Sequence, residues 1–297
     1  MKTILCRVVA AVVAVAFAAA PALAAEAPKK IVMIAGKPSH GPGEHEFNAG
    51  TLLLAKCLTE NAPNVAVTVV KGGWPEDESV FDGAAALVFY MDGGPNHPIA
   101  QGDHLAKVGA LMDKGVGLMC MHYGVEVLPE KGGTEFKKWI GGHYETNWSC
   151  NPMWEPDYQK FPQHPITNGV KPYKIRDEWY MTMRFRDDPS GITSILVAAP
   201  SDDVRDGPYV HPRGPYEHII KNSGKDETMM WCVERPDGGR GVGFTGGHFH
   251  KNWGDDNFRK VVLNALVWVA KAEVPAEGVP SKVTEDDLKQ NLDPKGR

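Results

Sequence analysis

The chain has 297 residues, with 32 Lys or Arg against 37 Asp or Glu and a formal net charge of −5 at neutral pH. Its basic residues form no run longer than isolated pairs such as Lys137-Lys138, which excludes the concentrated positive surface that nucleic-acid binding needs. A neutral or weakly polar small molecule fits this balance better. The length fits one large domain with an insertion, or two small domains.

The N-terminus has the pattern of a secretory signal peptide. Lys2 and Arg7 precede an apolar stretch at residues 8–20, and Ala22-Leu23-Ala24 is a small-x-small cleavage site. The apolar stretch is short for a membrane span. We therefore expect a signal peptide over residues 1–24, cleavage after Ala24, export to the periplasm or beyond, and a mature chain that is not held in a membrane.

Apolar strand patterns alternate with helical patterns along the first half of the chain. We expect strands at 31–35, 65–70, 84–90 and 115–121, with helices at 47–58 and 103–114. Strand patterns return at 192–199, 228–233 and 241–245, and a final amphipathic helix is expected at 256–271. This alternation predicts an α/β fold with a doubly wound, mostly parallel sheet, because parallel strands are joined by helices that cover both sheet faces.

Two segments lack this alternation. Residues from about 144 to 215 are rich in Trp, Pro, Asn and Tyr at their start, which predicts a long irregular insertion that could roof a pocket. Residues 275–297 are rich in Pro and charge and are expected to form a C-terminal surface tail after an α/β domain at 28–274.

The mature chain keeps Cys57, Cys120, Cys150 and Cys232. Export permits one disulfide among them, and the sequence does not select the pair.

Histidines follow four of the expected strands, in the segments 36–46, 92–97, 121–124 and 246–250. In an open parallel sheet, the loops at the carboxyl ends of the strands meet in one crevice, where ligands bind. Imidazole titrates near neutral pH and is the commonest metal ligand. Converging histidines therefore predict acid–base or metal chemistry at this edge of the sheet.

The strand at 117–121 runs into His122-Tyr123-Gly124, which is the layout of a nucleophile elbow. His122 stands where hydrolases and amidotransferases have Ser or Cys. Cys120 lies deeper in the strand and is a poor nucleophile, because a reactive thiol must be polarised and accessible. We interpret His122 as functional, although a hydrogen-bonded core histidine at the end of a strand would give the same pattern.

The other two histidine loops offer candidate ligands. On extended backbone, His248 and His250 would lie on one face and could bind a metal together. A solvated turn explains His250 equally well. His45 is the candidate ligand or acid of the first loop, which lacks the Gly-Lys-Ser/Thr ending of a phosphate-binding P-loop. No nucleotide cofactor is expected.

Carboxylates and aromatic rings near these loops suit sugar binding. Asp92, Asp177 and Glu178 could hold hydroxyl groups, and Trp148 and Tyr180 could stack on a sugar ring, as could Trp154 and Trp179. Two alternatives stay open at this point. Asp92 could only shape its turn, and Asp177 with Glu178 could be a solvated pair.

At these residues the chain resembles the trehalose-utilisation (ThuA-like) family, whose flavodoxin-like fold is similar to class I glutamine amidotransferases. The resemblance covers residues 31–274. It rests on His45-Glu46, the strand into His122, Gly141-Gly142-His143, His164-Pro165-Ile166-Thr167, Asp177-Glu178-x-Tyr180, and Gly246-Gly247-His248 with Trp253. It places His122 at the amidotransferase Cys position, which would exclude glutaminase chemistry. It also implies sugar substrates, namely 3-keto-glycosides made by a partner dehydrogenase.

We therefore expect an exported carbohydrate-active enzyme that cleaves a small 3-keto-glycoside by hydrolysis or elimination with the help of a divalent metal such as Zn or Mn. The expected metal ligands are His45, His122 and His248, and the expected catalytic residues are His122, His250 and Glu178. The expected substrate-binding residues are Asp92, Asp177, Tyr180, Trp148 and Tyr123. One alternative is a non-catalytic carbohydrate-binding protein on a degenerate amidotransferase fold. Another is a metal-dependent hydrolase of amides or esters.

Overall fold

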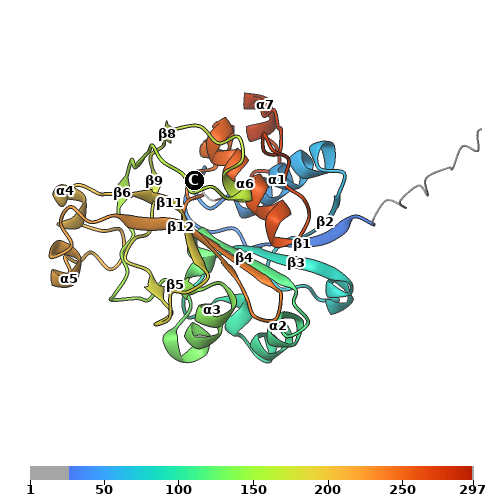
Figure 1. Cartoon of the computed structure of the whole chain (residues 1–297), viewed down its shortest axis with the longest axis horizontal. Helices are drawn as coiled ribbons and strands as arrows, with labels where there is room; N and C mark the ends of the chain where they lie inside the picture. The colour runs from blue at the N-terminus through green and yellow to red at the C-terminus, as the bar shows by residue number, and fades with distance from the viewer. Residues whose placement is uncertain (1–26, 296–297) are drawn as a thin grey trace, which may run out of the picture.

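The computed structural model describes residues 27–295, and a seven-stranded sheet forms the centre of this part of the chain (Figure 1). The strand order is β11-β12-β13-β4-β3-β1-β2. Its strands are β1 (Lys29–Ala35), β2 (Val65–Val70), β3 (Ala84–Tyr90), β4 (Gly117–Met121), β11 (Ile192–Ala198), β12 (Glu227–Glu234) and β13 (Arg240–Phe244). Neighbouring strands from β13 to β2 pair in parallel, whereas β12 runs antiparallel to both β11 and β13. The predicted α/β fold with a mostly parallel sheet is confirmed.

Helices cover both faces of the sheet, as the alternation along the sequence predicts. On one face lie α1 (Phe47–Asn61) and α6 (Asp256–Val269), and on the other lie α2 (His104–Met112) and α3 (Gly133–Trp139). Strand β1 serves both cores, because successive side chains on a strand point to opposite faces. Ile31, Met33 and Ala35 join the core beneath α1 and α6, and Val32 and Ile34 join the core above α2 and α3.

The predicted irregular insertion is interrupted by β11, which belongs to the central sheet, and otherwise contains mostly two-residue strands. These are β5 (Gly142–His143), β6 (Met153–Trp154), β7 (Asp157–Tyr158), β8 (Tyr173–Lys174), β9 (Asp177–Glu178) and β10 (Arg184–Phe185), followed by the short helices α4 (Asp202–Arg205) and α5 (Glu217–Ile220). The short strands pair as β5–β10, β6–β9 and β7–β8. Buried rings hold the insertion together, with Tyr158 and Trp179 packed edge to face at 5.5 Å between ring centroids.

Short 3₁₀ helices complete the connections. They are η1 (Glu78–Phe81), η2 (Pro98–Ala100), η3 (His122–Val125), η4 (Pro129–Lys131), η5 (Pro165–Thr167) and η6 (His250–Gly254).

None of the helices within residues 27–295 combines the length and the apolar character needed to cross a membrane. The expected signal peptide at 1–24 lies outside the described residues. Cys57, Cys120, Cys150 and Cys232 are all buried free thiols, so the permitted disulfide is not formed in the structure.

The C-terminal segment packs against the domain. Val279 is fully buried, and its N–H donates to the side chain of Asn264 in α6 at 2.8 Å. The helix α7 (Glu285–Leu288) contacts η6 and α1. Residues predicted as a surface tail therefore extend across the helices that support the first and last histidine loops.

Candidate active site

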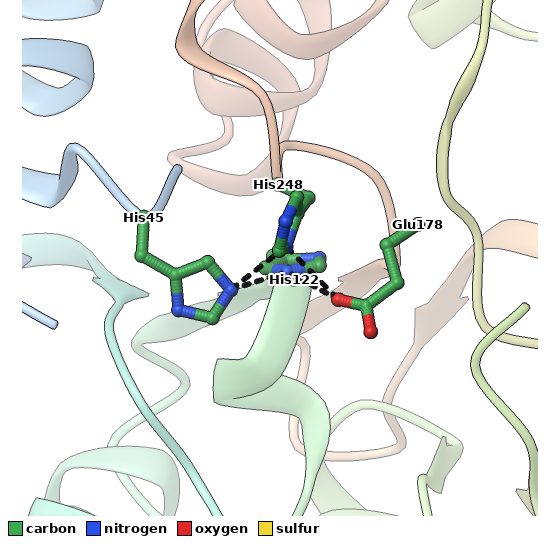
Figure 2. A group of neighbouring side chains, drawn as sticks. All are labelled: His45, His122, Glu178 and His248. Carbon is green, nitrogen blue, oxygen red and sulfur yellow. Dashed lines mark hydrogen bonds and ion pairs between the residues drawn. The ribbon is translucent and has the colours of Figure 1, made fainter. Parts of the chain in front are cut away.

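Three of the four histidine loops meet at the carboxyl edge of the parallel strands. His45 follows β1, His122 follows β4 and His248 follows β13, while Glu178 reaches them from β9 of the insertion (Figure 2). All four side chains are buried, and one ligand atom from each lies within 4.8 Å of the others. We call these four residues the histidine cluster. His97, from the fourth loop, is buried elsewhere: its Nδ1 accepts from the Ile99 N–H and its Nε2 donates to the Gly124 carbonyl.

The predicted elbow is present at His122. Met121 ends β4 in extended backbone, His122 has φ +53°, and η3 begins at the same residue. A positive φ is unusual for a residue with a side chain and is found where the surrounding structure forces it. The turn lifts the imidazole out of the strand and toward His45 and Glu178. Cys120 remains inside the sheet, and burial raises the pKa of its thiol, so it is not a nucleophile.

The loop after β3 packs against this elbow at Gly93, where a Cβ atom would lie 2.1 Å from the Tyr123 oxygen and 2.6 Å from the Glu126 oxygen. Both contacts are backbone atoms that cannot move aside singly. We therefore expect Gly93→Ala to lower the free energy of unfolding by about 1–3 kcal/mol, measured by urea denaturation. Gly109→Ala is the matched control, because its added methyl group would make an ordinary 3.5 Å contact with Trp139. Equal stability of the two variants would show that the loops can separate freely.

Hydrogen bonds on the outer side of the cluster fix how two imidazoles are protonated. His122 Nδ1 lies 2.8 Å from the carbonyl oxygen of Thr245, and His45 Nδ1 lies 2.9 Å from Oδ1 of Asp92. A carbonyl or carboxylate oxygen only accepts, so both Nδ1 atoms carry the proton. When both rings are neutral, their Nε2 atoms have lone pairs that face each other at 3.0 Å. Such a contact is repulsive unless a positive charge lies between the two nitrogens.

The other two members bring a carboxylate and a third imidazole to the same point. His248 Nδ1 is 3.0 Å from His45 Nε2 and 3.0 Å from Glu178 Oε2, which is 3.3 Å from His122 Nε2. Burial alone would raise the pKa of Glu178, but its bonds with His122 and His248 outweigh burial and lower it to about 2. Burial opposes the charged form of His248, yet Glu178 raises its pKa overall. A proton on His248 still leaves the contact between His45 and His122 without a hydrogen.

The cluster fits a divalent metal ion. A point central to four atoms with these spacings is about 2 Å from each, the bond length of zinc to imidazole nitrogen and carboxylate oxygen. Metal-binding imidazoles usually donate their other N–H to a carboxylate or carbonyl, as His45 and His122 do here. The remaining nitrogen of His248, Nε2, is buried without a hydrogen-bond partner among the described residues and lies 3.7 Å from Glu44 Oε1. Three nitrogens and one carboxylate oxygen suit zinc, manganese or a similar ion.

A cavity of about 210 Å³ opens beside the cluster. Its walls come from the α/β domain and from the insertion: His40, His45, Tyr123, Glu126, Thr146, Asn151, Glu178, Tyr180, Val210 and His211. The insertion thus roofs the site, as its aromatic and irregular sequence predicts. The cavity is smaller than the roughly 300–1,000 Å³ typical of drug-sized ligand sites, which favours a substrate reacting through a single small ring.

A larger cavity of about 550 Å³ lies where the carboxyl ends of β1, β2 and β3 meet, between Lys37, Trp74 and Asn96. None of the four cluster residues lines it, although Asp92 does. We place the chemistry in the smaller cavity, because converging ligand atoms and perturbed carboxyl groups mark a reactive site better than volume does.

Most of the predicted site residues gather here. His45, His122, His248 and Glu178 form the cluster. The hydroxyl of Tyr180 lies 3.4 Å from His122 Nε2, and Tyr123 lines the cavity. Asp92 is more than a turn residue, because it holds His45 Nδ1.

The predicted pairing of His248 with His250 is wrong. The chain stays extended through Phe249 but turns into η6 at His250, and His250 Nε2 instead contacts the carbonyl oxygen of Leu288 in the C-terminal segment. His250 therefore lies outside the cluster, and its predicted catalytic role has no support from its position.

Two predicted substrate-binding residues have other contacts. Asp177 is fully buried, and its two oxygens accept from the N–H groups of Gly247 and His248 and from Asn252, so it shapes the His248 loop instead of binding a hydroxyl. Trp148 stacks on His218 with ring centroids 4.3 Å apart, and Arg184 lies 3.9 Å from its ring centroid. It is not among the residues that line the cavity.

Glu126 is a cavity residue that the sequence analysis missed. It lies four residues beyond His122 and is 9% exposed. The one signal that could have selected it is its place just after the elbow.

Comparisons with known proteins agree with this architecture. The ThuA family, described as trehalose utilisation, matches residues 32–269. A putative ThuA-like protein from Bacteroides uniformis has 14% identity and a TM-score of 0.56, covering 84% of this chain and 95% of its own. A putative ThuA-like protein from Parabacteroides merdae has 16% identity and a TM-score of 0.56, covering 87% and 94%. At such identities the likeness shows the fold alone, and a search of curated proteins found no match. Because the family match spans most of the sequence, the chain belongs to the ThuA (trehalose utilisation) family.

Proposed function

We propose that this protein is an exported, metal-dependent enzyme that cleaves 3-keto-glycosides by elimination followed by hydration. The observation that carries the proposal is the convergence of two facing imidazole nitrogens, a third imidazole and a carboxylate beside a small polar cavity. The sugar substrate rests on the family description, trehalose utilisation. Export rests on the signal pattern at residues 1–24, and N-terminal sequencing of the mature protein tests it.

The chemistry follows from the acidity of a carbon next to a ketone. In a 3-keto-glycoside, loss of the proton on C2 leads to departure of the group on C1. A divalent metal held by His45, His122, His248 and Glu178 would supply positive charge for the developing negative charge on the C3 oxygen. The Asp92 carboxylate keeps His45 in the tautomer whose Nε2 faces inward.

The cavity walls supply neutral donors for sugar hydroxyls. Burial raises the pKa of Tyr123 to about 12 and raises that of Tyr180 well above its ordinary value, so both hydroxyls stay protonated at neutral pH. The side-chain nitrogen of Asn151 donates to Glu178 Oε1 at 2.9 Å and keeps this carboxylate turned toward His122 and His248.

Metal analysis of the purified protein tests the proposal. We expect about one divalent ion per chain, loss of that ion on dialysis against a chelator, and loss of 3-keto-glycoside cleavage with it. Re-addition of zinc or manganese should restore turnover, because the ligands are already oriented by Asp92 and Thr245.

The alternative of a non-catalytic sugar-binding protein predicts the opposite results. It requires sugar binding without turnover and no bound ion in the purified protein. Turnover that persists after complete removal of metal would also contradict the proposal. The other alternative is a metal-dependent hydrolase of amides or esters. It predicts that a panel of amide and ester substrates is cleaved without chelator and is not cleaved with chelator.

A further inference from the structure

Glu126 is a second buried carboxylate on the wall of the cavity, distinct from the cluster. Its Oε1 accepts a hydrogen bond from the Thr146 hydroxyl at 2.6 Å. Its backbone is held on both sides, because its N–H donates to the Tyr123 carbonyl at 3.0 Å and its carbonyl accepts from the Gly94 N–H at 2.9 Å. The other carboxylate oxygen, Oε2, makes no hydrogen bond with residues 27–295, and the side chain lines the cavity. It is available to a molecule in the cavity.

The other titratable groups of the cavity are already hydrogen-bonded, are too weakly acidic, or belong to exposed residues. Both ring nitrogens of His45 are engaged, and Glu178 bonds with His122, His248 and Asn151. Tyr123 and Tyr180 have raised pKa values and are too weakly acidic to exchange protons at neutral pH. The rings of His40 and His211 belong to exposed residues. Glu126 is the buried acid with an uncommitted oxygen.

The two carboxyl groups of the cavity, Glu126 and Glu178, have pKa values that are shifted in opposite directions. Burial, with a smaller contribution from the negative charge of Glu178, raises the pKa of Glu126 to about 7 against the opposing effect of the Thr146 hydroxyl. Glu178, in contrast, has its pKa lowered to about 2. Two carboxyl groups whose environments push their pKa values apart are typical of acid–base sites. The titratable groups that face Glu126 or share its cavity are Glu178, Tyr123, Tyr144, Tyr180, His40, His45 and His211.

We propose, resting on the function proposed above, that Glu126 is the catalytic acid–base residue, which takes the C2 proton and returns it to the departing glycosidic oxygen. As a carboxylate, its Oε2 accepts the proton from C2, and the C2–H electron pair ends in a C1=C2 double bond. The C1–O bond breaks with its electrons on oxygen, which receives the proton from Glu126. Water then adds across the double bond, hydroxyl to C1 and proton to C2, to give the free 3-keto sugar.

Glu126→Gln tests this role, because the amide oxygen can still accept from Thr146 while the group can no longer carry a proton. We expect kcat to fall by about 10²–10⁴-fold, the usual contribution of general acid–base catalysis, with unchanged metal content and thermal unfolding. Glu126→Asp should keep part of the activity. Glu130→Gln is the matched control, since it removes the same charge at an exposed position four residues away and should turn over normally.

The pH dependence gives a second readout. Because the carboxylate form must take the proton, kcat/KM of the wild type should rise with pH through about 7, and this rise should be absent from the residual activity of Glu126→Gln. Thr146→Val removes a bond that stabilises the carboxylate, so the rise should move to higher pH. A role of Glu126 in folding alone would move none of these profiles.

Two measurements keep this inference separate from the proposed function. In the metal-free protein, NMR of ¹³C-labelled Glu should show one carboxyl group that titrates near pH 7 and disappears in Glu126→Gln. With a 3-keto-1-deoxy sugar, which has no leaving group, the wild-type holoenzyme should exchange the C2 proton with D₂O and the variant should not. Cleavage by the wild type with equal cleavage by Glu126→Gln overturns the role of Glu126. Failure of every keto-glycoside as a substrate overturns the proposed function, while the NMR titration still tests the carboxyl group.

Discussion

His122→Asn is expected to abolish metal retention and keto-glycoside cleavage while leaving the fold intact. Asn tolerates the positive φ that His122 adopts better than most residues do, but its short side chain cannot reach the position of Nε2. Loss of an outer partner of a metal ligand typically lowers affinity about 10–100-fold, and loss of a ligand itself should exceed this. Metal titration of the chelated protein, read as a change in melting temperature, measures the affinity directly.

The same variant makes an unusual prediction for the metal-free state. Two lone pairs 3.0 Å apart are unfavourable without a cation, so metal-free His122→Asn should be at least as stable as the metal-free wild type. The free energy of unfolding of the wild type, and not that of the variant, should then rise by about 2.7 kcal/mol when free metal reaches 100 times the wild-type Kd. His218→Asn is the control, because His218 lies outside the cluster and its ring stacks on Trp148. A metal-free variant that is clearly less stable than the wild type would indicate a structural histidine.

The sheet and its histidine edge could be predicted because each strand is a short apolar run between turn residues. The expected strands at 65–70 and 84–90 coincide with β2 and β3. Three cluster members could be selected from 11 histidines for one physical reason. His45, His122 and His248 each follow a strand of one parallel sheet, and the carboxyl ends of such strands share an edge.

The rest of the site depends on contacts between distant segments, which periodicity does not report. Glu178 was selected as a carboxylate of the site, but its contact with the imidazoles of His122 and His248 requires the insertion to fold back over the sheet. The neighbouring residue Asp177 is not part of the cluster, because its carboxylate accepts hydrogen bonds from the backbone N–H groups of Gly247 and His248. Glu126 was missed because its burial depends on Thr146 of the insertion, 20 residues away. His250 was misplaced because extended backbone was assumed to continue one residue too far.

The C-terminal segment contributes to the site through a buried ion pair. The Lys295 ammonium group lies 3.4 Å from Glu46 Oε1, with side chains only 4% and 2% exposed. It also donates to the carbonyl oxygens of Gly41 and Glu44 in the loop that carries His45. Glu46 in turn accepts from the N–H groups of Gly43 and Asp293 at 2.8 and 2.7 Å. One carboxylate and one ammonium group thus join the two chain segments.

Lys295→Met is therefore expected to lower the free energy of unfolding by about 3–5 kcal/mol, the usual effect of leaving one partner of a buried ion pair without its counter-charge. The His45 loop should loosen, so metal affinity should fall although no ligand has changed. Urea denaturation of the metal-free protein and metal titration measure the two effects separately.

Two further variants identify the cause of this loss. In Glu46→Gln/Lys295→Met no buried charge is left unpaired, so the double variant should be more stable than the sum of the single changes predicts. Lys289→Met breaks an exposed pair with Asp286, whose side chains are 67% and 89% exposed, and should change stability by no more than about 1 kcal/mol. If Lys295→Met behaves like Lys289→Met, the segment merely rests on the surface. If it lowers both stability and metal affinity, the end of the described chain is part of what orients His45, because the loop has no other cation buried against Glu46 among residues 27–295.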